Sequence, residues 1–152
     1  MNRIAEFYKV SAAQFDREGY EDIKLPRRAT TGSAGYDFFA PYDFTLDVGE
    51  EIVIDTGIRA RINEGWVLVI LPRSGSGFKY GVRLANTAGV IDSDYFNADN
   101  EGHIKIKLVG GSKRYEVKKG SAFAQGIFLP FGITESDSVT EERHGGFGST
   151  GK

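Results

Sequence analysis

The segment Ile104-Lys105-Ile106-Lys107-Leu108 alternates apolar and charged side chains without interruption. Because successive side chains of a β-strand point to opposite faces of the sheet, this alternation predicts a strand with one buried face and one solvated face. Other short apolar stretches recur along the chain between turn-forming residues, as in proteins built from many strands. The predicted strands are Ile4–Val10, Tyr36–Ala40, Glu51–Ile54, Gly57–Ile62, Trp66–Leu71, Gly89–Ile91, His103–Val109, Tyr115–Val117 and Ala122–Leu129.

Tight turns are predicted between these strands, and helix is scarce. The turn segments are Asp47-Val48-Gly49, Asn63-Glu64-Gly65, Gly110-Gly111-Ser112 and Lys118-Lys119-Gly120. The segment Ser11-Ala12-Ala13-Gln14 is typical of a capping box, so a short helix is predicted over Ala12–Glu18 with Gly19 as its stop. Many short strands joined by glycine-rich turns predict an all-β sandwich or barrel.

Size and composition narrow the function. A chain of 152 residues with 40% hydrophobic and 26% charged residues is a globular protein of one domain. A net charge of −2 provides no basic field for a nucleic-acid backbone, so nucleic acid is not an expected partner. With no cysteine and two histidines, disulfides are excluded and a zinc site is disfavoured. Any metal is expected to be a hard cation held by oxygen atoms.

Neither a membrane span nor a signal peptide is expected. The longest apolar run, Trp66 to Leu71, is too short to cross a bilayer, and the first ten residues lack a long apolar segment. The cytoplasm is therefore the default expectation. The stretch from Thr134 to Lys152 is polar and then glycine-rich. It cannot bury enough apolar surface to fold alone, so we expect a β-domain over residues 1–133 and a mobile arm over 134–152.

Two segments in the first half of the chain carry candidate phosphate or metal chemistry. Asp37 lies inside the apolar strand Ala34–Ala40, either as a strand-end residue that caps a turn or as a ligand to a hydrated cation. Pro72-Arg73-Ser74-Gly75-Ser76-Gly77 directly follows the most apolar strand. It offers a guanidinium, a hydroxyl and backbone N–H groups, which a phosphate needs, but it is also compatible with an ordinary surface loop. It lacks the Gly-Lys-Ser/Thr ending of a P-loop.

Two later segments offer groups for a base and for water. Asn86 has a paired donor and acceptor, the complement of a pyrimidine edge. Asp92 and Asp94 are two residues apart and would share one face of a strand, where either one is a candidate general base. The alternative is a hairpin with polar turn residues and a packing tyrosine, Tyr95. Gln125 lies in an apolar strand, either as a satisfied core amide or as a contact to ligand or water.

The fifth segment is Arg143-His144-Gly145-Gly146-Phe147-Gly148-Ser149-Thr150-Gly151. It places one aromatic residue among glycines near the end of the chain. A flexible arm of this composition can close over a ligand, stack Phe147 on a base and donate N–H groups to phosphates. The alternative is a disordered linker or remnant.

These five segments, in this order, resemble the five motifs of the trimeric dUTPase family over about residues 30–151. The resemblance implies hydrolysis of dUTP to dUMP and pyrophosphate with Mg²⁺ as cofactor. It also implies a jelly-roll β-barrel with at most short helices, assembled as a homotrimer. Three active sites would lie at subunit interfaces, each closed by a C-terminal arm from a neighbouring subunit.

The resemblance also implies a role for each motif residue. Asp92 would activate the water that attacks the α-phosphorus. Asn86 would read the uracil edge, and Tyr95 would pack under the deoxyribose and exclude a 2′-hydroxyl. A hairpin backbone that touches the base would leave no room for a 5-methyl group. The remaining implied substrate contacts are Arg73, Ser74, Gly75, Gly89, Gln125, Arg143, Phe147, Gly148, Ser149 and Thr150, and the implied metal contact, through water, is Asp37.

Two features depart from the family pattern. The short Arg-Gly turn expected after Tyr95 is replaced by the longer loop Phe96–Gly102. The fifth motif is one residue short between Arg143 and Gly145. Two alternatives remain open. One is a dCTP deaminase-like enzyme, which needs a Glu-based site and lacks the glycine-rich arm. The other is a non-catalytic dUTP-binding regulatory module, with the loop Phe96–Gly102 as a protein-binding surface.

Overall fold

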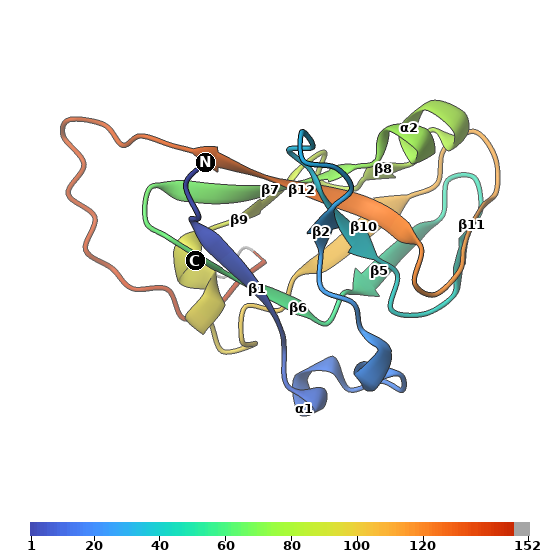
Figure 1. The fold of residues 1–152 in the computed structure, drawn as a ribbon, viewed down its shortest axis with the longest axis horizontal. Helices are drawn as coiled ribbons and strands as arrows, with labels where there is room; N and C mark the ends of the chain where they lie inside the picture. The colour runs from blue at the N-terminus through green and yellow to red at the C-terminus, as the bar shows by residue number, and fades with distance from the viewer. Residues whose placement is uncertain (148–152) are drawn as a thin grey trace.

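The computed structural model describes residues 1–147, which form short antiparallel strands arranged in four sheets (Figure 1). The strands are β1 (Ala5–Lys9), β2 (Arg27–Arg28), β3 (Tyr36–Phe39), β4 (Phe44–Leu46), β5 (Glu51–Asp55), β6 (Ile58–Ile62), β7 (Trp66–Pro72), β8 (Arg83–Leu84), β9 (Gly89–Ile91), β10 (Lys105–Val109), β11 (Tyr115–Val117) and β12 (Ala122–Pro130). The helices are α1 (Ala12–Phe15), α2 (Ser74–Tyr80) and the 3₁₀ helices η1 (Tyr20–Asp22) and η2 (Ser93–Asn97).

The largest sheet has the strand order β2-β3-β12-β7-β9. The smaller sheets are β5-β10-β8, β1-β6 and β11-β4. Every strand pair in the described residues is antiparallel. Strand β7 lies between β12, with which it pairs over seven positions, and β9, with which it pairs over three, so it supports two strands that carry motif residues.

The alternating segment behaves as its pattern predicts. In β10, Ile106 and Leu108 are buried, while Lys105 and Lys107 keep their ammonium groups on the other face. There they form ion pairs with the partner strand β5: Lys105 Nζ lies 3.3 Å from Asp55 Oδ1, and Lys107 Nζ lies 2.7 Å from a carboxylate oxygen of Glu51. The buried face joins a single apolar core. Its most deeply buried large members are Phe38, Phe123, Leu46, Ile54, Leu68, Ile70, Ile104, Ile106, Leu108 and Val10.

All nine predicted strands are present, with ends that agree to within two residues. The short strands β2, β4 and β8 were not predicted, because two or three residues are too few to display a period of two. The prediction of helix up to Glu18 is wrong. Asp16 adopts the left-handed conformation (φ 51°), so α1 ends at Phe15. Ser11 does cap this helix by accepting a hydrogen bond from the Gln14 N–H.

Helix α2 was also missed. Its sequence, Ser-Gly-Ser-Gly-Phe-Lys-Tyr, contains two glycines and reads as a loop by intrinsic preference. Tertiary contacts override that preference: the Ser76 hydroxyl is buried and donates to the Arg73 carbonyl at 2.9 Å. In addition, Gly81 ends the helix in the left-handed conformation that glycine adopts most easily (φ 67°).

The chain leaves the sheets after β12. From Phe131 to Phe147 it forms neither helix nor strand, and it follows a long excursion back to η2 (Figure 1). The mobility of this arm stays a prediction. No helix within residues 1–147 is long and apolar enough to cross a membrane.

Candidate functional site

Strand β7 places the motif residues at its two opposite ends. Arg73 directly follows β7, whereas Asp92 follows Ile91, which pairs with Leu68 near the start of the strand. Asp92 is therefore level with Val67, six residues before Arg73. At about 3.3 Å per residue, the two side chains start about 20 Å apart within one chain. Figure 1 shows this separation, with α2 at one end of the largest sheet and η2 at the other.

The first group of motif residues surrounds the end of β7. The Arg73 Nε donates to Asp37 Oδ1 at 3.0 Å, and its guanidinium remains partly exposed. Asp37 on β3 is the register partner of Gln125 on β12. The Gln125 side-chain amide donates to the Pro72 carbonyl at 3.0 Å, so it is tied to the strand that carries Arg73. The structure thus brings Asp37, Arg73 and Gln125 together, and we call them the Arg73 cluster.

Ser74 and Gly75 begin helix α2 beside this cluster. Arg73 occupies the N-cap position in an extended conformation, which turns its side chain back toward β3 and β12. A side chain at Gly75 would meet no atom within 4 Å, so space is open around its backbone. A partly exposed guanidinium therefore lies beside open backbone at the start of α2, an arrangement suited to an anion.

A second group lies on the turn between β8, which pairs with β10, and β9, which pairs with β7 in the largest sheet. Thr87 takes a left-handed conformation (φ 68°), and its N–H donates to the Leu84 carbonyl at 3.1 Å to close the turn. Asn86 and Gly89 border a pocket of about 310 Å³. A Cβ at Gly89 would come within 3.2 Å of Ile70 Cβ, so the backbone itself forms this wall. The pocket is lined by Ile70, Leu84, Ala85, Asn86, Gly89, Ile91, Lys105, Ile106, Lys107 and Phe147.

Asp92 and Asp94 follow strand β9. The expectation that the two residues share a strand is wrong. Strand β9 ends at Ile91, and residues 93–97 form the 3₁₀ helix η2. The two carboxylates nevertheless contact the same guanidinium. The Arg143 Nη2 lies 2.6 Å from Asp92 Oδ2, and its Nε lies 2.7 Å from Asp94 Oδ1. Asp92 is about half exposed, so solvent has access to it.

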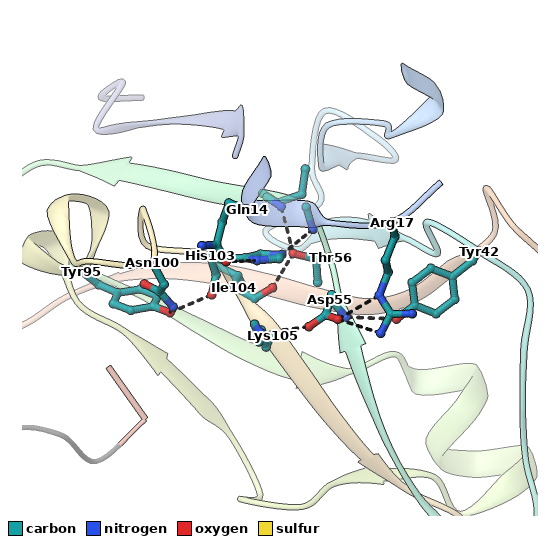
Figure 2. A network of polar contacts seen from close by, with 12 residues as sticks. Gln14, Arg17, Tyr42, Asp55, Thr56, Tyr95, Asn100, His103, Ile104 and Lys105 are labelled. Atoms are coloured by element: carbon teal, nitrogen blue, oxygen red, sulfur yellow. Dashed lines mark hydrogen bonds and ion pairs between the residues drawn. The ribbon is translucent and has the colours of Figure 1, made fainter. Parts of the chain in front are cut away.

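Tyr95 is buried within a polar network shown in Figure 2. Its hydroxyl donates to the His103 carbonyl at 2.7 Å and accepts from the Asn100 amide at 2.8 Å. Burial raises the pKa of Tyr95. Burial also lowers the pKa of His103 to about 4, because the charged ring would lose its hydration. The neutral ring accepts from the Gly57 N–H at Nε2 (2.9 Å), so Nδ1 carries the proton and donates to Gln14 (3.1 Å).

The arm lies against this same region of its own chain. The Phe147 ring lines the pocket and stands edge-on to Tyr95, with ring centroids 6.2 Å apart. Gly146 passes so close to Tyr95 that a Cβ would lie 2.5 Å from the ring. The Asp99 N–H donates to the His144 carbonyl at 3.0 Å. The predicted contacts of Gly148, Ser149 and Thr150 lie outside the described residues.

Sequence reasoning missed Asn100, which bonds to the Tyr95 hydroxyl, and His103, whose side-chain partner Gln14 is 89 positions away in the chain. It also missed Lys105 and Lys107 as pocket residues, although the alternation of β10 already placed both on one face. Within residues 1–147, no group of three or more histidine or carboxylate side chains is arranged to hold a metal ion. Asp37, the predicted metal contact, is instead paired with Arg73.

Comparisons with known proteins identify the family of the chain. A family model described as dUTPase matches residues 21–151. The chain is 41% identical, over 133 residues, to the deoxyuridine 5'-triphosphate nucleotidohydrolase of Lactococcus lactis subsp. lactis, with 85% of this chain and 89% of that protein covered.

Solved structures show the same fold. The dUTPase of Streptococcus mutans superposes with a TM-score of 0.72 at 32% identity, covering 86% of this chain and 98% of that one. A mutant dUTPase from phage phi11 of S. aureus, solved to reveal the coordination of a structural Mg(II) ion, has a TM-score of 0.67 at 22% identity and covers 91% and 98%. The predicted jelly-roll fold is confirmed, and the chain belongs to the dUTPase family.

Proposed function

We propose that this protein hydrolyses dUTP to dUMP and pyrophosphate, with Asp92 as the general base. One observation carries the proposal: a solvent-accessible carboxylate adjoins a pocket that combines a backbone wall, an amide and an aromatic ring. The amide belongs to Asn86, the wall to Gly89 and the ring to Phe147. These groups match the needs of a pyrimidine nucleotide: edge recognition, close fit and stacking.

The backbone at Gly89 accounts for selection against thymine. A loose apolar pocket distinguishes one methyl group by only about 10- to 200-fold. The wall at Gly89 on β9 is more rigid than such a pocket. Its backbone is held by pairing with β7, and Gly89 has no side chain that could move aside. A 5-methyl group directed at this backbone would displace the strand rather than a rotamer.

Asp92 would accept a proton from water while the water oxygen attacks the α-phosphorus. A bond forms between that oxygen and phosphorus, the bond to the α–β bridging oxygen breaks, and pyrophosphate leaves. General-base assistance of this kind is typically worth about 10²- to 10⁴-fold in rate. Arg143 pairs with both Asp92 and Asp94. A bound triphosphate would draw that guanidinium away and free Asp92 for water.

Arg73 and Gln125 of the Arg73 cluster, together with the neighbouring Ser74, would hold the phosphate chain. Mg²⁺ would neutralise charge on the phosphates when bound across them. The residues present fit an ion that arrives with the nucleotide, since Asp37 is a single carboxylate rather than part of a protein cage. Its Oδ1 is paired with Arg73, which leaves Oδ2 to reach the ion through water. A phage phi11 dUTPase mutant was solved with a structural Mg(II) ion, which supports Mg²⁺ as a metal that such a fold binds.

The separation of Asp92 from Arg73 supports a site shared between subunits. Both must reach one triphosphate, yet they lie about 20 Å apart along β7. A second copy would supply the missing half, so we propose a homotrimer with three equivalent interface sites and the arm as the third component. Phe147, Gly148, Ser149 and Thr150 would close over the base and the γ-phosphate.

Subunit mixing tests this arrangement. Asp92→Asn and Arg73→Ala proteins should each be nearly inactive, and refolding them together in equal amounts should restore about a quarter of the wild-type sites, from random assembly of closed threefold rings. A site built within one chain predicts no recovery. Separately refolded and then pooled variants are the control, and equal activity in the pooled and co-refolded samples would refute the shared site.

Pyrophosphate release from dUTP, dTTP, dCTP and UTP with Mg²⁺ tests the reaction itself. Only dUTP should be used well. Asp92→Asn should abolish release, and a chain ending at Glu142 should still bind dUTP but turn over poorly. Formation of a uracil nucleotide from dCTP would favour the deaminase-like alternative. Tight dUTP binding without turnover would favour the regulatory module.

A further inference from the structure

We propose that Asn100, in the loop Phe96–Gly102, is a positioning residue for sugar recognition: its side-chain amide fixes the Tyr95 hydroxyl and thereby the ring that meets the deoxyribose. This inference rests on the proposed function and on the role that the family resemblance implies for Tyr95, packed beneath the deoxyribose. It gives a role to the loop that departs from the family pattern.

The hydrogen bonds around Tyr95 leave its hydroxyl one arrangement. Its single proton goes to the His103 carbonyl at 2.7 Å, so the oxygen accepts from the Asn100 Nδ2 at 2.8 Å (Figure 2). The Asn100 Oδ1 is in turn held by the Gly102 N–H at 3.2 Å. Tyr95 is 6% exposed, and its ring therefore cannot shift without leaving one of these buried groups unpaired.

The loop that carries Asn100 is anchored at both ends. At one end Arg59 donates to the Phe96 carbonyl, and its guanidinium lies 3.6 Å from the centre of the Phe96 ring. At the other end the Glu101 carboxylate accepts from the Ser11 N–H (2.9 Å) and hydroxyl (2.6 Å). The loop is thus part of the protein body, and Asn100 is presented from a fixed backbone.

The backbone turn after Asn100 requires glycine. Gly102 has φ 69°, and a Cβ there would lie 2.6 Å from the Tyr95 carbonyl oxygen. The other side of the Tyr95 ring meets Gly146 and Phe147 of the arm. A small displacement of the ring would therefore alter the sugar contact and the closed arm together.

The Asn100→Asp variant isolates the single bond in question. An aspartate keeps the oxygen that accepts from Gly102 but replaces the donor to Tyr95 with an acceptor, so the single hydroxyl proton can no longer serve His103 while residue 100 donates to the oxygen. Asn97→Asp is the matched control, since Asn97 lies exposed near the start of the same loop and gains the same charge. Tyr95→Phe removes the hydroxyl and supplies the background for a double-mutant cycle.

The measurement is the ratio of dUMP to UMP affinity by calorimetry, together with kcat/KM for dUTP and UTP. Asn100→Asp should lower both ratios about five-fold, the usual worth of one hydrogen bond. Asn97→Asp should leave them unchanged, and Asn100→Asp should add nothing in the Tyr95→Phe background. The inference is overturned if Asn100→Asp lowers only thermal stability with both ratios intact, or if it costs as much without the hydroxyl as with it.

The two proposals fail separately. Wild-type protein that prefers dUMP but releases no pyrophosphate from dUTP refutes the hydrolase, while loss of that preference in Asn100→Asp still supports the positioning role. Wild-type hydrolysis with an unchanged ratio in Asn100→Asp refutes the positioning role alone. Wild-type protein that neither releases pyrophosphate from dUTP nor prefers dUMP to UMP overturns both.

Discussion

Lowering the pH should destabilise this protein through one buried ring, His103. Its side chain is fully buried, and its Nε2 accepts a hydrogen bond from the Gly57 N–H. Protonation of Nε2 would make it a second donor facing the Gly57 N–H, and the hydrogen bond would be lost. Burial lowers its pKa from 6.5 to about 4. The unfolded chain therefore takes up the proton first, and stability that is present at pH 7 is lost as the pH falls from about 6.5 to about 4.

The size of this effect follows from the shift. A difference of about 2.5 pH units at roughly 1.4 kcal/mol per unit corresponds to about 3 kcal/mol, of which about 2 kcal/mol is gone by pH 5. Carboxylates with lowered pKa, such as Glu101 beside Ser11, lose their contribution only near pH 4 and below. The histidine effect therefore has a pH window of its own.

Urea unfolding at fixed protein concentration, from pH 7 to 4.5, measures this loss. The comparison is His103→Gln, because glutamine can still accept from Gly57 and does not titrate. The variant should be less stable at pH 7, but its stability should change much less between pH 6.5 and 5. Parallel pH profiles for the two proteins would show that His103 is not the titrating group.

Two further substitutions test close backbone approaches. In Gly35→Ala, the new methyl group would overlap the Gln125 Oε1 and displace that amide. Steady-state kinetics should show kcat/KM for dUTP lowered about 10- to 100-fold, and calorimetry should show little change in melting temperature. A lower melting temperature with unchanged kcat/KM would contradict this reasoning. In Gly110→Ala, the methyl group would overlap the Asp47 carbonyl oxygen, and a backbone atom cannot move aside freely. The free energy of unfolding should fall by about 3 kcal/mol, which corresponds to a melting temperature about 10 °C lower. The control is Gly132→Ala, whose methyl group would meet no neighbour and which should melt like the wild type.

The strands could be predicted because their information is local. The alternation in β10 and the apolar run of β7 each fix a face or a length within a few residues. The turn before Asp92 could also be predicted, since glycine and polar residues lie between two apolar segments, but its flanking strands pair with other strands and form no hairpin. Helix α2 was not readable, because Ser76 and Gly81 stabilise it through contacts and a conformation that no period displays.

The site was predicted as a set of residues but not as a geometry. Motif order identified Asp92, Arg73 and Asn86, yet a linear sequence gives no distance between them. The long-range partners were invisible for the same reason: His103 bonds to Gln14, 89 positions away in the chain. Asn100 was passed over because its one informative contact is with a hydroxyl whose direction is set by a backbone carbonyl.

The length of β7 has a genetic consequence. If one strand keeps the water-activating carboxylate and the phosphate-binding cation too far apart to contact the same substrate molecule, an isolated protomer is inactive at any substrate concentration. Specific activity should then collapse on dilution below the assembly threshold. An inactive variant subunit produced in the same cell would assemble with wild-type subunits and inactivate the sites that they share. Some inactivating alleles should therefore be dominant-negative.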